Sequence, residues 1–80
     1  MILIYDNGGV SFDRYTAFDN NDYSLSNGTK YYRGVGFSDN PFHPQGFGQH
    51  IEVSKGAHLG NRIALKNLPI KAQIFIREVF

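Results

Sequence analysis

Clusters of Asp, Asn and Gly break the first half of the chain into short apolar stretches, and this division limits the folds open to it. The turn sequence DNGG at residues 6–9 separates MILIY from VSFDRYTAF. Asn and Gly readily take the positive φ angles of tight hairpin turns. We therefore expect a β-hairpin whose arms are residues 1–5 and 10–18.

Two more turn clusters follow this hairpin. DNND at residues 19–22 and NGT at residues 27–29 enclose the short strand candidate YSLS, and KYYRGVGF comes next. NRIAL at residues 61–65 is a further short candidate. Stretches of this kind, separated by turn residues, predict a small, mostly antiparallel β-sheet.

Side-chain alternation in these strands bears on how the sheet is covered. The even-numbered residues from Phe12 to Phe18 share one face of the second arm, and neither face of that arm is cleanly apolar. We expect this strand to be covered only in part, or to present one face for function. Gly34 and Gly36 also share a face, which predicts close packing against a helix or a neighbouring strand.

The C-terminal stretch LPIKAQIFIREVF predicts the only helix. Pro69 suits the first position of a helix. Apolar residues then recur at helical spacing, namely Leu68, Ala72, Phe75, Ile76 and Val79. The β-branched and aromatic residues of QIFIREVF leave a strand as the competing interpretation.

These elements predict one α+β domain over residues 1–80, in which a small, mostly antiparallel sheet packs on a C-terminal helix. A long ordered loop, about residues 38–60, is expected over an end or edge of the sheet, and a loop of that length is commonly functional. The chain has no cysteine, so disulfides cannot stabilise its small core. Five Tyr and seven Phe, or assembly into a homo-oligomer, are expected to compensate.

Hydropathy and charge limit the classes of partner. No apolar run approaches the ~20 residues that cross a bilayer, and the N-terminus lacks the features of a signal peptide. We therefore expect a soluble, unexported protein with no membrane partner. Residues 1–40 carry three basic and five acidic residues, and residues 41–80 carry five and two. The basic second half suits an anionic ligand, but no dense Lys/Arg stripe indicates long nucleic acid.

The segment SDNPFHPQGFGQH at residues 38–50 is the candidate binding loop, because its prolines and glycines suit neither a strand nor a helix. Backbone N–H groups in a glycine-containing turn can hold an anion, and imidazole and amide groups add polar contacts. A structural loop with its aromatic rings in the core remains the alternative. The candidate ligand-binding residues here are His43, Gln45, Gly46, Phe47, Gly48, Gln49 and His50.

Two arginines complete the candidate site. Arg14 and Arg33 can clamp a carboxylate or phosphate, while Arg14 could equally anchor the loop or pack its stem on aromatic rings. His43, His50 and His58 are spaced by seven and eight residues, which is unlike the spacing of most metal-ligand pairs. No cofactor fingerprint is present, so we expect neither a metal nor a cofactor.

Catalysis is supported by residue types alone. His43 and His50 could act as acid and base in a phosphodiester-cleaving enzyme, with an arginine stabilising the phosphorane-like state. The chain has no nucleophile elbow and no cysteine nucleophile. A binding protein is therefore the favoured interpretation, and an enzyme stays open as the alternative.

Three blocks of the sequence resemble a known family. They are YDNGGVSFDRYTAF, SDNPFHPQGFGQH and HLGNRIALKNLP. The chain resembles short, mostly uncharacterised proteins of tailed bacteriophages that carry DNGG-x-x-x-DRYT, NPxxPQGFxQ and HLGxxI…LP in this order. The resemblance spans most of the chain, and the segment from Asn20 to Lys30 departs from it. It implies an accessory protein in the cytoplasm of an infected bacterial host, and it carries over no catalytic residue.

The function expected from these features is stoichiometric binding through the PQGFGQH loop. In the phage context this protein would be a host-defence antagonist that sequesters a nucleotide-like signal or blocks a host protein. A phosphodiester-cleaving enzyme and a purely structural or assembly module are the alternatives.

Overall fold

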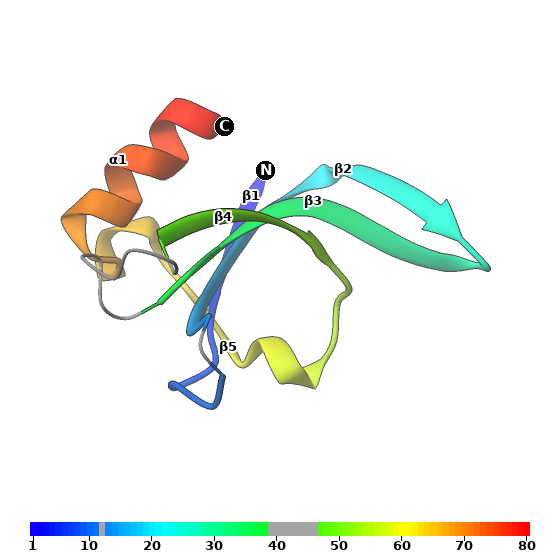
Figure 1. Cartoon of the computed structure of the whole chain (residues 1–80), viewed down its shortest axis with the longest axis horizontal. Helices are drawn as coiled ribbons and strands as arrows, with labels where there is room; N and C mark the ends of the chain where they lie inside the picture. The colour runs from blue at the N-terminus through cyan, green and yellow to red at the C-terminus, as the bar shows by residue number, and fades with distance from the viewer. Residues whose placement is uncertain (12, 39–46) are drawn as a thin grey trace.

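The computed structural model describes residues 1–11, 13–38 and 47–80, with the backbone alone at residues 47–49 (Figure 1). In these residues five strands form one antiparallel sheet in the order β4-β3-β2-β1-β5. The strands are β1 (Ile2–Asp6), β2 (Tyr15–Ser26), β3 (Thr29–Phe37), β4 (Phe47–Val53) and β5 (Asn61–Ile63). The short 3-10 turns η1 (Ala57–Leu59) and η2 (Leu65–Asn67) precede the helix α1 (Ile70–Val79). The predicted α+β class, with an antiparallel sheet and a C-terminal helix, is confirmed.

The first hairpin joins β1 to β2, but its second arm begins later than predicted. Strand β2 starts at Tyr15, and Val10 is 89% exposed. The reason is local, because the Asn7 side chain accepts hydrogen bonds from the backbone N–H groups of Gly9 and Val10. These bonds compete with a strand ladder and hold the start of the predicted arm as a turn.

The second hairpin, β2–β3, is longer than predicted because residues 19–22 do not reverse the chain. They lie inside β2, at a shift of register between Phe18 and Tyr23, where the Asp19 carboxylate accepts the backbone N–H of Asn21. The predicted turn at residues 27–29 does form, with positive φ at Asn27 and Gly28. Figure 1 shows this hairpin reaching well beyond the rest of the fold.

Strand β4 corrects the predicted loop of residues 38–60. Residues 47–53 pair with β3, where Gly34 lies opposite Ile51 and Val35 opposite His50. This pairing gives hydrogen-bond partners to the backbone N–H and C=O groups along one edge of β3. If residues 47–53 were a loop, those groups would have no strand beside them. Residues 39–46 lie outside the described residues, and the remaining part, residues 54–60, contains η1.

Both faces of the sheet are covered at residues 15–18, where the predicted second arm was expected to be covered only in part, whereas residues 21–26 of β2 are exposed. On one face, α1 closes a core made of Ile4, Tyr15, Ala17, Val35, Phe37, Leu68, Ala72 and Ile76. On the other face, η1 closes a smaller core made of Leu3, Phe18, Tyr32, Val53 and Leu59. Figure 1 shows α1 and η1 on opposite sides of the sheet. Strands β1, β2 and β3 therefore carry apolar residues on both faces at their centre.

Aromatic rings supply much of this core, as the composition predicted. Phe18 is fully buried, stacks on Tyr5 with ring centroids 5.9 Å apart, and contacts Tyr32 at 4.9 Å. On the helix face, the Phe37 ring meets Phe75 edge-on at 5.7 Å. Such pairs add stabilisation beyond the burial of their area.

Helix α1 confirms the helical interpretation of the C-terminal stretch. Pro69 is the residue just before the first helical turn, one position earlier than predicted. Leu68, Ala72 and Ile76 are buried against the sheet, while Val79 is 39% exposed. The predicted stripe therefore packs along most of its length. No helix in the described residues is long and apolar enough to cross a membrane.

The close packing predicted at Gly34 and Gly36 is confirmed. A Cβ on Gly34 would lie 2.6 Å from the Ala17 carbonyl oxygen and 2.8 Å from a methyl carbon of Val53. A Cβ on Gly36 would lie 2.8 Å from the Asp13 carboxylate. Both glycines thus give space to neighbouring segments rather than to a bound molecule.

Candidate functional site

The predicted binding loop is only partly within the structure. His43, Gln45 and Gly46 lie outside the described residues, and only the backbone of Phe47, Gly48 and Gln49 is placed. This backbone belongs to β4, with a shift of register against β3 at Gly48. The predicted anion-binding turn includes residues outside the described part of the chain, so it stays a prediction.

Arg33 and His50 are brought together by the pairing of β3 and β4. Both are exposed and line a small hollow of about 180 Å³, which Asp22 and Phe80 also line. The residue opposite Arg33 on β4 is Glu52. Asp22 in this hollow and Glu52 beside it place two carboxylates near one guanidinium, so the hollow suits a phosphate poorly.

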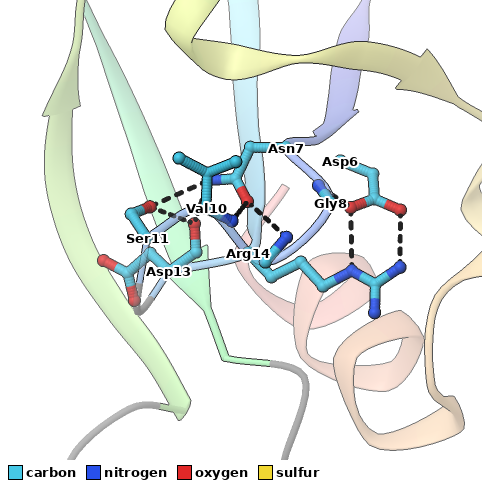
Figure 2. A network of polar contacts seen from close by, with 8 residues as sticks. Asp6, Asn7, Gly8, Val10, Ser11, Asp13 and Arg14 are labelled. Carbon is cyan, nitrogen blue, oxygen red and sulfur yellow. Dashed lines mark hydrogen bonds and ion pairs between the residues drawn. The ribbon is translucent and has the colours of Figure 1, made fainter.

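Arg14 does clamp a carboxylate, but that carboxylate is the protein's own Asp6. Figure 2 shows the Arg14 guanidinium turned to Asp6, on one side of the turn that joins β1 to β2. The Arg14 Nε donates to Asp6 Oδ1 at 2.8 Å and a terminal nitrogen donates to Oδ2 at 3.1 Å. The hydrogen bond from Arg14 is the largest cause that lowers the pKa of Asp6. Arg14 therefore stabilises the fold at this position.

A larger hollow than the one beside Arg33 lies elsewhere, between β1, β5 and the C-terminal half of α1. We call it the β1–α1 groove, and its volume is about 520 Å³. This volume falls within the range of roughly 300–1,000 Å³ that is usual for small-molecule sites. Its lining residues are Ile2, Ile4, Arg62, Ile63, Ala64, Leu65, Ile76, Arg77 and Phe80. None of them belongs to the site predicted from the sequence.

The β1–α1 groove combines aliphatic walls with two cationic residues. Arg62 lies on the edge strand β5, and Arg77 follows the buried Ile76 on α1. Within the described part of the chain, neither guanidinium forms an ion pair or a side-chain hydrogen bond. No acidic residue is among the described residues that line the groove. The two guanidinium groups therefore attract a negative group beside an apolar surface, and the negative end of the α1 dipole at Phe80 offsets part of this attraction.

The described residues give no support for a metal centre. No group of three or more His, Cys, Asp or Glu among them could hold a metal ion. His50 on β4 and His58 on η1 line different hollows. Neither histidine lines the β1–α1 groove.

Searches with the chain against protein-family models, characterised proteins and solved structures found no match. The resemblance to tailed-phage proteins therefore stays a prediction.

Proposed function

We propose that this protein binds a small amphipathic anion stoichiometrically in the β1–α1 groove, and that the ligand is nucleotide-like. The observation that carries the proposal is the position of Arg62 and Arg77, which are unpaired in the described chain and line this mostly apolar groove. An apolar or flat body would lie against Ile4 and Ile63. Its phosphate would meet a guanidinium.

The chemistry of the two residue types supports this division of roles. Guanidinium groups present a planar set of donors that matches the oxygens of a phosphate. The aliphatic walls gain free energy from any apolar surface that they remove from water. Neither the guanidinium groups nor the aliphatic walls alone would give strong binding. Inorganic phosphate has no apolar surface for the walls, and a neutral apolar molecule has no charge for the guanidinium groups. A ligand that carries both a charge and an apolar surface is therefore preferred.

The groove supports binding better than turnover. Among the described residues that line it there is no carboxylate, imidazole, hydroxyl or thiol side chain to move a proton or attack a bond. The phosphodiester-cleaving alternative would need His43 and His50, and His43 lies outside the described residues. Sequestration of a nucleotide signal in an infected bacterium is the biological form of this proposal, and it draws on the phage resemblance.

A protein partner is the second candidate, and the β2–β3 hairpin favours it. The far end of this hairpin exposes Tyr23 by 45% and Leu25 by 67%, and Lys30 lies 4.5 Å from the Tyr23 ring centroid. Figure 1 shows this end projecting away from both covered faces of the sheet. Apolar side chains on a projecting hairpin suit contact with another protein.

Calorimetric titration with adenosine monophosphate tests the ligand class. We expect saturable binding that weakens by roughly tenfold in Arg77→Ala, which corresponds to the loss of one charged contact. Arg33→Ala is the matched control, because Arg33 is also exposed and unpaired in the described chain but does not line the groove. Equal weakening in both variants would contradict the groove as the site.

Titrations with decanoate and with inorganic phosphate test separately whether the groove is a binding site and whether its ligand is nucleotide-like. Binding of decanoate without binding of adenosine monophosphate would keep the groove as a site and overturn the nucleotide-like class. Binding of neither amphipathic anion to the folded protein would overturn the proposed function. Inorganic phosphate alone is expected to bind weakly, because it leaves the apolar walls uncovered.

A further inference from the structure

A second hollow lies on the opposite face of the sheet, beside the turn that joins β1 to β2. We call it the Asp13 pocket, and its volume is about 220 Å³. It lies between that turn, strand β4 and the η1 segment. Its lining residues are Asn7, Ser11, Asp13, Thr16, Ile51, Glu52, Val53, Ser54, His58 and Leu59. Among the described residues, it shares none with the β1–α1 groove.

The Asp13 carboxylate is the unusual group in this pocket. Its Oδ1 atom is buried and accepts no hydrogen bond. Burial also raises the pKa of Asp13. Figure 2 shows Asp13 on the other side of the turn from the Arg14–Asp6 pair, so Arg14 is engaged elsewhere. Asp13 as a whole is half-buried, but a carboxylate oxygen that is buried without a partner costs free energy unless another group compensates it.

The turn holds this carboxylate in place. The Asn7 Nδ2 donates to the Asp13 carbonyl oxygen at 3.0 Å and to the Ser11 Oγ at 2.8 Å. Gly36 leaves the space that the carboxylate occupies, since a Cβ there would lie 2.8 Å from it. The position of Asp13 is thus fixed from two sides, by its own turn and by a glycine on β3.

Charge around the pocket selects the sign of a ligand. Asp13 and Glu52 are its acidic residues, and His58 is its third titratable residue. No Lys or Arg is among the described residues that line it. An anion would meet two like charges there, whereas a cation would compensate the buried one. With fewer than three metal-binding side chains grouped at any point in the described chain, a metal ion is not supported.

We infer that the Asp13 pocket is a binding site for a primary ammonium group. An ammonium carries three donors and one positive charge. The Asp13 carboxylate would take the charge and one donor, and the hydroxyl groups of Thr16 and Ser54 are acceptors for the others. The ammonium can belong to a free alkylamine or to a lysine side chain of a partner, and both present the same group on an alkyl stem.

The test is a nuclear magnetic resonance titration with butylammonium chloride and, separately, with a blocked lysine, N-acetyl-lysine methylamide. Ile51 is the isoleucine that lines this pocket, so its methyl signal is expected to shift saturably, while Ile2 and Ile63 in the groove stay unchanged. Bound ammonium should also move the titration midpoint of the Asp13 carboxyl carbon to lower pH. The titratable groups facing Asp13, Glu52 and His58, need to be followed in the same experiment.

Asp13→Asn should weaken butylammonium binding by roughly tenfold or more, while Asp22→Asn, an exposed acid outside the pocket, should leave it unchanged. Binding of both probes indicates a site that also takes lysine side chains, and binding of butylammonium alone indicates a free amine. Unchanged Ile51 signals at saturating amine, or equal binding by Asp13→Asn, would overturn the inference. Since nucleotide binding is read at different isoleucines, its failure and the failure of this site are separable.

Discussion

Arg14 and Asp6 form a two-pronged ion pair across the turn between β1 and β2, with donor–acceptor distances of 2.8 and 3.1 Å. The backbone N–H of Asn7 donates to the Arg14 carbonyl oxygen at 2.9 Å in the same turn. The Arg14 guanidinium also lies 5.1 Å from the centroid of the Tyr15 ring. These contacts fix the point where the first hairpin closes, and Asp13, the residue before Arg14, lies on the opposite side of the turn (Figure 2).

Arg14→Ala is expected to lower the free energy of unfolding by about 1 kcal/mol, because the pair is partly exposed but has bidentate geometry. For a chain of this size that corresponds to a fall in Tm of roughly 5 °C. Arg33→Ala, which removes an exposed arginine without a partner in the described chain, is the control and should leave Tm unchanged. A double-mutant cycle with Asp6→Asn measures the coupling, and additive effects of the two substitutions would contradict a stabilising pair.

The same pair gives stability a dependence on acid pH. The hydrogen bond from Arg14 lowers the pKa of Asp6 below its ordinary value of 3.8. The pair's contribution is therefore fully present above pH 3.8 and is lost as pH falls through the pKa of the folded state. Denaturant midpoints measured between pH 2 and 6 should show this loss in the wild-type protein and a smaller one in Asp6→Asn.

Asp13 should give the free energy of unfolding the opposite dependence on pH. Burial raises its pKa above 3.8, so the folded state holds the proton at pH values where the unfolded chain has lost it. The stability contribution of Asp13 is thus present below pH 3.8 and lost as pH rises through the folded-state pKa. Asp13→Asn is expected to raise the free energy of unfolding at pH 7 by about 1 kcal/mol. If Asp13→Asn destabilises the protein at neutral pH, Asp13 has a compensating partner.

Gly34→Ala should destabilise the sheet by about 1–3 kcal/mol, because the added Cβ meets the Ala17 carbonyl oxygen and Val53 in a packed interior. Gly56→Ala is the matched control. A Cβ there approaches only the ring of His58, an exposed side chain that can move away. Thermal unfolding should therefore show a marked fall in Tm for Gly34→Ala and a change near zero for Gly56→Ala. Equal falls in Tm for the two variants would show that the contacts at Gly34 do not determine the loss of stability.

Much of the fold could be predicted from local patterns. The Asn27-Gly28 turn and the Pro69 start of α1 follow from backbone chemistry that needs no tertiary contact. Strand β4 could not be predicted in this way, because Pro and Gly at residues 41–48 hide the short alternation of His50 to Val53. Pairing with β3 decides its structure.

The site was harder to predict than the fold. The β1–α1 groove exists because the edge strand β5 lies beside β1 and near the end of α1, and no local pattern brings Arg62 and Arg77 together. The excess of basic residues in the second half was the signal available in the sequence. Asp13 likewise resembles any other acidic residue near a turn. Its importance follows from burial by segments far along the chain.

A bulky substitution at an exposed lining residue should block the β1–α1 groove. Ala64 is exposed and lines the groove, so Ala64→Trp should fill it without disturbing the core. We expect adenosine monophosphate binding to fall by at least roughly tenfold, with Tm nearly unchanged. Calorimetry and thermal unfolding of the same sample measure the two quantities. Retained binding by Ala64→Trp would contradict the groove as the site.

Isoleucine methyl spectra during titration with adenosine monophosphate test the proposed site most directly. Ile2, Ile4, Ile63 and Ile76 line the β1–α1 groove, whereas Ile51, Ile70 and Ile74 do not. We predict saturable shifts confined to the first four methyl groups, with a midpoint at a roughly tenfold higher nucleotide concentration in Arg77→Ala. Shifts at Ile51 instead would place the nucleotide by Arg33 and His50 or in the Asp13 pocket, and unchanged spectra at saturating nucleotide would contradict the proposed function.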